Sequence, residues 1–109
     1  MPKFVTIGYG DQDGYDRTED DVKARAHEHD VRLASMGAVI GIAGSPVHVR
    51  NAGGRGVETL PGAFMRAGLP IAGFALIDAA DLEEAVQLAA MTPCAVAGGV
   101  VEVWPLLEN

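Results

Sequence analysis

The feature that most constrains the fold of this sequence is a short segment that is apolar on both of its faces. Residues 71–77 read I-A-G-F-A-L-I, and their length and composition predict a β-strand. Successive side chains of a strand point to opposite faces of its sheet, so both faces of this strand are apolar. Residues 38–43, A-V-I-G-I-A, show the same pattern. The chain must therefore form a sheet that is covered on both sides.

Runs of β-branched and apolar residues predict the other strands, at 3–9, 47–50 and 100–106, with a further short one at 57–60. The turn N-A-G-G-R-G separates 47–50 from 57–60, which makes that pair antiparallel. Residues 11–17 are predicted to be a polar loop. Residues 60–70, bracketed by prolines, are predicted to be an ordered loop.

A helix is predicted at 18–36 because apolar side chains recur there at helical spacing. Thr18 and Asp21 resemble an N-cap pair, and Gly37 supplies a C-terminal stop. One face of this helix carries Val22, Ala26, His29, Leu33 and Met36. His29 is therefore expected to point inward.

A second helix is predicted at 78–91, where the apolar face consists of Leu82, Ala85, Val86 and Ala89. Asp81 and Glu84 form a plausible capping box at its start. Pro93 is expected to end it.

The predicted elements follow the order β-α-β-β-α-β, the ferredoxin-like pattern of an α+β fold. This topology places both helices on one face of an antiparallel sheet. A chain of 109 residues supports one core, so residues 1–109 are expected to form a single domain. The other, apolar face is most simply covered by a second copy, which predicts a homodimer.

Charge and cysteine content restrict the partners and the compartment. The formal net charge is −7, which repels phosphate backbones and anionic membranes, so neither nucleic acid nor membrane is an expected partner. Cys94 is the sole cysteine, which excludes an intramolecular disulfide and indicates a reducing compartment. We find no signal-peptide pattern and no apolar run of about 20 residues, and we expect a cytoplasmic protein.

The C-terminal half combines a strand ending in Asp78, a helix that begins D-L-E-E-A, a Pro-containing turn and a closing V-E-V-W-P strand. In this combination it resembles the YCII-related family, and the N-terminal strand and G-A-V-I-G are similar more loosely. The resemblance implies a dimeric α+β barrel, in which two sheets pack face to face and a pocket lies between sheet and helices. The function of the family is mostly unassigned.

Two family motifs bear on function. One branch carries D-G-P-F before the penultimate strand; the nearest match here is Pro61-Gly62-Ala63-Phe64, which lacks the acid. Another branch pairs a histidine of the first helix with an aspartate, proposed as an acid–base dyad. This chain offers His27 and His29, and the register does not decide between them.

His29 and His27 are the candidate catalytic residues, because an imidazole titrates near neutral pH and can serve as general acid or base beside a pocket. The alternative for both is a histidine that only packs in the core. A His29 that faces a cleft with a carboxylate or Arg within reach would indicate an enzyme. A buried His29 that is hydrogen-bonded to backbone would indicate a binding module.

The candidate ligand-binding residues are Tyr9, Arg50, Phe64, Met65 and Trp104. The aromatic and Met side chains among them are suited to line an apolar pocket for a small organic molecule. Packing in the core or in a dimer is the alternative for these side chains.

No metal site and no cofactor are expected. In H-E-H the imidazoles of His27 and His29 lie about 200° apart around a helix, too far to share an ion. D-Q-D-G-Y-D lacks the spacing of a calcium loop, and no helix follows A-G-G-R-G to hold a phosphate. Cys94 lies at a helix end, where the dipole disfavours a thiolate nucleophile.

Two functions of different class remain. One is a cofactor-free enzyme that uses a histidine of the first helix as acid–base on a small metabolite. The other is a non-catalytic module that binds a small molecule or a protein.

Overall fold

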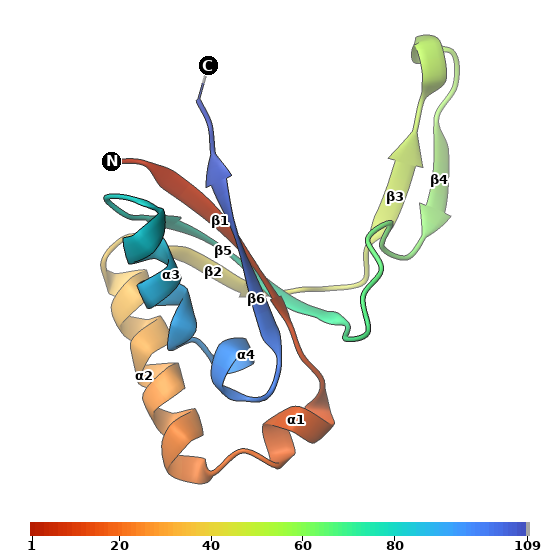
Figure 1. Cartoon of the computed structure of the whole chain (residues 1–109). Helices are drawn as coiled ribbons and strands as arrows, with labels where there is room; N and C mark the ends of the chain where they lie inside the picture. Colours follow the sequence, from red (N-terminus) through yellow and green to blue (C-terminus); the bar gives the residue numbers. More distant parts are fainter. Residues whose placement is uncertain (109) are drawn as a thin grey trace.

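Four strands form an antiparallel sheet at the centre of the molecule (Figure 1). The computed structural model describes residues 1–108. The strands are β1 (Lys3–Tyr9), β2 (Val39–Ile42), β5 (Ile71–Asp78) and β6 (Val100–Leu106), in the order β2-β5-β1-β6. All neighbouring pairs are antiparallel. The α+β class predicted from the sequence is confirmed.

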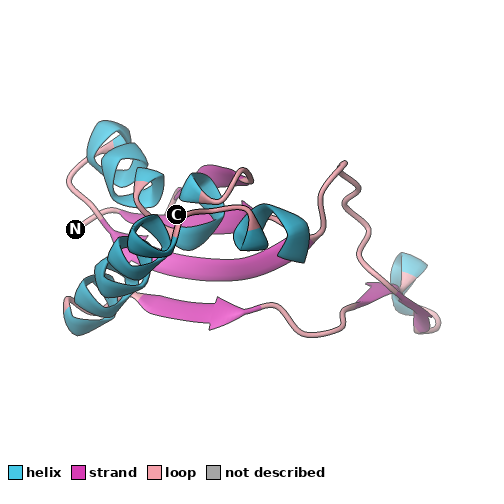
Figure 2. Cartoon of the chain, turned by 90° about the horizontal axis from the view of Figure 1, so that it is seen from below, coloured by secondary structure: helices cyan, strands magenta, loops and turns pink. Residues whose placement is uncertain are grey.

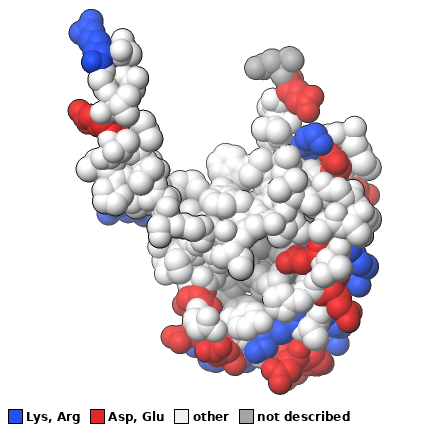
Figure 3. Space-filling model, turned by 180° about the vertical axis from the view of Figure 1, so that it is seen from behind, with Lys and Arg blue, Asp and Glu red and all other residues white. Residues whose placement is uncertain are grey.

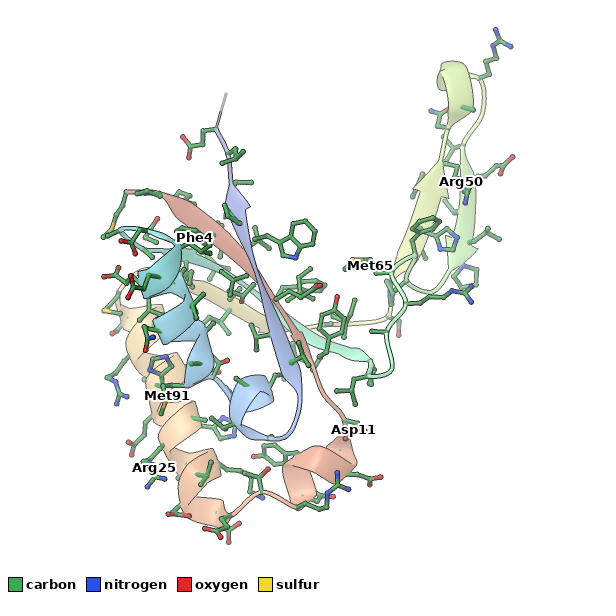
Figure 4. The ribbon with its side chains drawn as sticks, in the orientation of Figure 1. Phe4, Asp11, Arg25, Arg50, Met65 and Met91 are labelled. Atoms are coloured by element: carbon green, nitrogen blue, oxygen red, sulfur yellow. The ribbon has the colours of Figure 1, made fainter. Side chains whose placement is uncertain are left out.

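Four helices gather on one side of this sheet (Figure 2). They are α1 (Gln12–Asp16), α2 (Asp20–Ser35), α3 (Leu82–Ala90) and α4 (Pro93–Val96). The core lies between the sheet and α3, where Phe4 and Ile77 pack with Ala79 and Ala85. Figure 4 labels Phe4 at this layer. The small alanines let α3 approach the sheet closely.

The apolar face predicted for the first long helix is confirmed only in part. Ala26 and Leu33 of α2 are buried, Val22 and His29 are half-buried, and Met36 is 66% exposed. Gly37 ends the helix with a φ of 101°, the left-handed conformation expected of a glycine stop. Helix α2 therefore covers the sheet with its middle, and its C-terminal end extends past the core.

Two predicted helix starts are wrong. Thr18 does not cap α2: its hydroxyl donates to the Gly14 carbonyl at 2.8 Å, and the helix begins after Glu19 without a side-chain cap. The second helix begins at Leu82 rather than at residue 78, because β5 continues through Asp78.

The predicted cap and the predicted end of the second helix agree with the structure. Asp81 accepts from the Glu84 N–H at 2.8 Å, so the predicted cap is confirmed. Pro93 follows the end of α3 and also begins α4.

The segment predicted to be a polar loop contains helix α1. Asp11 begins this helix by accepting a hydrogen bond from the Gly14 N–H at 2.8 Å (Asp11 is labelled in Figure 4). A Cβ on Gly14 would lie 2.6 Å from the Ala97 carbonyl oxygen. Only glycine therefore lets α1 lie against the end of α4.

Strands β3 (Val47–Arg50) and β4 (Glu58–Pro61) form a separate two-stranded sheet. They are antiparallel, as predicted, and the short 3₁₀ turn η1 (Ala52–Gly54) joins them. The hairpin projects away from the body of the molecule (Figure 1). We call residues 46–66 the arm.

The side of the main sheet that carries no helix is apolar, and we call it the open face. Strand register places Val5, Leu76 and Trp104 side by side, and next to them Ile7, Phe74 and Glu102. Trp104 is 52% and Phe74 47% exposed. Figure 3, seen from behind, shows a broad area without Lys, Arg, Asp or Glu between the charged helical end and the arm. The two-sided apolar pattern of β5 thus leaves one side uncovered in a single chain.

Candidate functional site

A cleft of about 980 Å³ opens between the helix-bearing face of the sheet and helix α2. Its floor is formed by Thr6 and Gly8 of β1 with parts of β2 and β5, and α4 contributes Pro93 and Cys94. Gly8 is required for this packing, because a Cβ there would lie 2.9 Å from the Cys94 Sγ. The space above Gly8 is therefore filled by the Cys94 side chain, which forms part of the cleft wall.

The polar groups of the cleft come from α1 and α2. The Tyr15 hydroxyl and the His27 Nε2 are hydrogen-bonded at 2.9 Å, and both residues line the cleft. The Lys23 ammonium lies 4.6 Å from the centre of the Tyr15 ring. Asp30 follows His27 by three positions, so it extends from the same side of α2 into the cleft.

The surroundings of Asp30 favour its protonated form. Partial burial raises the pKa of the Asp30 carboxyl, and the nearby His29 and His27 offset part of that rise. A carboxyl with a raised pKa is better suited to exchange protons near neutral pH than an ordinary one.

Cys94 is held as a neutral thiol. Burial raises its pKa, and the charge of Asp30 raises it further. The sequence-based reason for this, a position at the negative end of a helix dipole, is wrong, because Cys94 lies in the first turn of α4; burial is what disfavours the thiolate.

Among the described residues that line it, the cleft has acidic side chains and no Lys or Arg, and His27 is its basic group. Asp11 and Asp30 are its two acids, and most of the remaining lining is aliphatic or glycine. An anionic ligand would meet this acidic lining with no Lys or Arg to hold it. The lining therefore favours neutral or positively charged molecules with an apolar body.

The structure separates the two predicted catalytic histidines. His27 lines the cleft. His29 instead donates from Nε2 to the Leu88 carbonyl at 2.7 Å, which joins α2 to α3. His29 is half-buried and bonded to backbone, the arrangement expected of a histidine that serves the fold and, by the test set from the sequence, of a binding module rather than of an enzyme that uses His29.

The five predicted ligand-binding residues all fall within the described chain, and none of them lines this cleft. Tyr9 and Trp104 lie on the open face, where Glu102 accepts from the Tyr9 hydroxyl at 2.7 Å and from the Trp104 Nε1 at 3.5 Å. The bond to Glu102 raises the pKa of Tyr9.

The other three of the five belong to the arm. The Arg50 guanidinium lies 5.6 Å from the centre of the Phe64 ring, and Met65 follows Phe64. Trp104 and these arm residues are exposed, so packing against another molecule is the better interpretation of them, whereas Tyr9 is buried within the chain and packs in its core.

Tyr15, Asp30 and Thr6 are the cleft residues that sequence reasoning missed. Tyr15 lies inside D-Q-D-G-Y-D, where the acids and Gly14 suggested a loop. Asp30 directly follows H-E-H and could have been found from its spacing of three from His27 on a helix.

The sequence matches no protein-family model, and no curated protein matches it. Within residues 1–108, we find no group of three or more Cys, His, Asp or Glu side chains that could hold a metal ion. Over the same part of the chain, no helix is both long and apolar enough to cross a bilayer.

Replacing His29 by Ala is expected to lower stability. The variant loses the bond between α2 and α3 and leaves the Leu88 carbonyl unpaired, at a cost of about 1–3 kcal/mol. Thermal melting should show a drop of several degrees. His27→Ala is the control and should melt close to wild type, since His27 is exposed. Equal melting of His29→Ala and wild type would contradict this role.

Replacing Asp30 by Asn is expected to raise the melting temperature slightly at neutral pH. The folded-state pKa of Asp30 is raised, so its favourable contribution is complete below the unfolded pKa of about 3.8 and is lost as pH rises through the folded pKa. Asn mimics the protonated form, so its advantage should vanish below about pH 4. Asp21→Asn, on the exposed side of α2, is the control. A lower melting temperature for Asp30→Asn at neutral pH would refute the assignment.

Proposed function

We propose that this protein is a cofactor-free enzyme that transfers protons on a small metabolite bound in the cleft. The observation that carries the proposal is the convergence of the hydrogen-bonded Tyr15 and His27 pair and the Asp30 carboxyl on one apolar cleft. Such a cleft, with few polar groups that include a carboxyl of perturbed pKa, is the usual setting of an active site.

The proposed roles follow from the geometry. His27 is the general acid or base, because imidazole is the side chain that most often transfers protons in active sites and Tyr15 fixes its orientation through Nε2. Asp30 stabilises the imidazolium or exchanges a second proton. The aliphatic floor binds the apolar part of the substrate, and the carboxylates favour a neutral or cationic molecule.

We also propose the family, the oligomeric state and the location of this protein. The strand order is β2-β5-β1-β6, and helices connect β1 to β2 and β5 to β6. This arrangement supports a ferredoxin-like core of the YCII-related kind. The apolar open face supports a homodimer in which two sheets pack face to face. The single cysteine supports a cytoplasmic location.

A matched set of probes tests the substrate class. Cyclohexylamine, cyclohexanol and cyclohexanecarboxylate share one apolar ring and differ in charge. We expect the amine and the alcohol to raise the melting temperature of the protein, and the carboxylate to have little effect. Preferential stabilisation by the carboxylate would contradict the proposed charge selectivity, and Asp30→Asn should reduce the preference for the amine.

Non-catalytic binding of the same kind of molecule is the second candidate. It is favoured by the mainly apolar lining of the cleft and by the structural bond of His29. A binding module would bind these molecules without exchanging their protons.

A further inference from the structure

The arm packs almost entirely on itself. The Gly62 N–H donates to the Pro46 carbonyl at 2.9 Å at its base, and His48 Nδ1 bonds to the Gly62 carbonyl at 3.0 Å. Phe64 folds back on His48 with ring centres 6.0 Å apart. An isolated two-stranded hairpin is only marginally stable in water. The arm therefore needs a second surface to be a persistent element.

Both faces of the arm expose apolar side chains. Val47 and Val49 alternate with His48 and Arg50 along β3, so the two valines lie on one face and the other face carries Leu60 opposite His48. Val49 is 59%, Leu60 52% and Phe64 70% exposed. Such a long apolar hairpin with free edges is a surface for another chain.

The arm and the open face border the same space. Figure 1 shows the arm standing apart from the sheet, on the side away from α2 and α3, and Figure 4 labels Met65 where the arm meets the body. The molecule extends 52 × 36 × 20 Å as a result. Another molecule that packs on the open face would therefore lie alongside the arm.

The distribution of charge indicates which molecule packs between the arm and the open face. The arm carries three of the 8 basic residues, Arg50, Arg55 and Arg66, and only one of the 15 acidic ones, Glu58. The rest of the chain therefore carries nearly all of the acidic residues and is strongly acidic. A second copy of this chain has 14 acidic and 5 basic residues outside its arm, so it attracts these arginines as well as offering an apolar open face.

We infer that the arm of each protomer clasps the partner subunit in the homodimer, burying Leu60 or Val49 against it. This inference rests on the proposed dimer, and it adds that the arm, besides the open face, holds the two copies together. Glu102 on the open face supports it. This carboxylate accepts hydrogen bonds from Tyr9 and Trp104, but burying its charge between two sheets is costly unless a cation lies nearby, and the arm supplies arginines.

Hydrogen exchange at the arm amides, measured on wild type above and below the dimer dissociation midpoint, tests the inference. We expect the amides of β3 and β4 to be protected in the dimer and to exchange much faster in the monomer. A dimer whose arm exchanges rapidly would overturn the clasp and leave the proposed dimer standing. Absence of any dimer would overturn both. Protection that is equal in monomer and dimer would show that the arm folds without a partner, and would also overturn the clasp.

Full-length variants give a second readout. Of Val49→Asp and Leu60→Asp, one on each face of the arm, at least one should raise the dimer dissociation constant about tenfold or more in sedimentation experiments. Val31→Asp is the matched control, because Val31 is 69% exposed on α2, and it should leave dimerisation unchanged. Wild-type dissociation constants for both arm variants would contradict the clasp.

Discussion

Replacing Phe74 by Asp makes the protein monomeric at micromolar concentration. Phe74 lies opposite Ile7 in the middle of the open face and is 47% exposed in a single chain. In the proposed dimer a charge at this position would be buried against the partner sheet, on the same face as the carboxylate of Glu102. We expect the dissociation constant to rise roughly 100-fold or more, which corresponds to about 3 kcal/mol.

Light scattering and sedimentation would measure this change, and thermal melting would show whether the variant still folds. Because Phe74 is half-exposed, the monomer should remain folded. Leu76→Asp, on the same face, should act in the same way, and Val31→Asp should not. A wild type that is monomeric at these concentrations would refute the dimer directly.

Replacing Gly99 by Ala is expected to destabilise the protein by about 3 kcal/mol, and to lower its melting temperature by roughly 10 °C or more. A Cβ at this position would overlap the Tyr9 carbonyl oxygen and lie 2.8 Å from the Cys94 carbonyl oxygen. The Gly99 N–H also donates to that Cys94 carbonyl at 3.0 Å. The close approach joins the turn after α4 to the end of β1, at the base of the cleft.

Gly56→Ala is the control for this effect, because a Cβ on Gly56 has no atom of the described chain within 4 Å. Melting of both variants and of wild type would measure the difference. If Gly99→Ala melts like Gly56→Ala, the tight packing of this turn against β1 would be contradicted.

The strands could be predicted from the sequence because the residue types within each strand favour that structure by themselves. Residues 3–9, 47–50 and 100–106 form strands with the predicted limits, since β-branched and aromatic residues pack well on a pleated surface. Helix α1 could not be predicted in this way. Its Gly14 indicates a loop, and the contact with the Ala97 carbonyl that makes glycine necessary exists only in the folded chain.

The candidate site was predictable only in part for a similar reason. Helical spacing shows on which side of α2 each histidine lies, but it does not show which element lies opposite. His29 meets α3 at Leu88, and His27 meets α1 at Tyr15. His29 was the first choice for catalysis because it lies on the apolar face of the helix. In the structure that face packs against another helix.

Proton exchange between solvent and a bound ligand tests the central claim most directly. Cyclohexanone, a neutral ring of the same size whose C–H groups next to the carbonyl are exchangeable, would be incubated in D₂O with wild type, His27→Gln and His48→Gln. We expect wild type and His48→Gln to accelerate loss of the C–H signal. His27→Gln should bind the molecule equally well and be slower by about 100-fold or more. Equal rates for His27→Gln and wild type, or binding by wild type without any exchange, would contradict acid–base catalysis in this cleft.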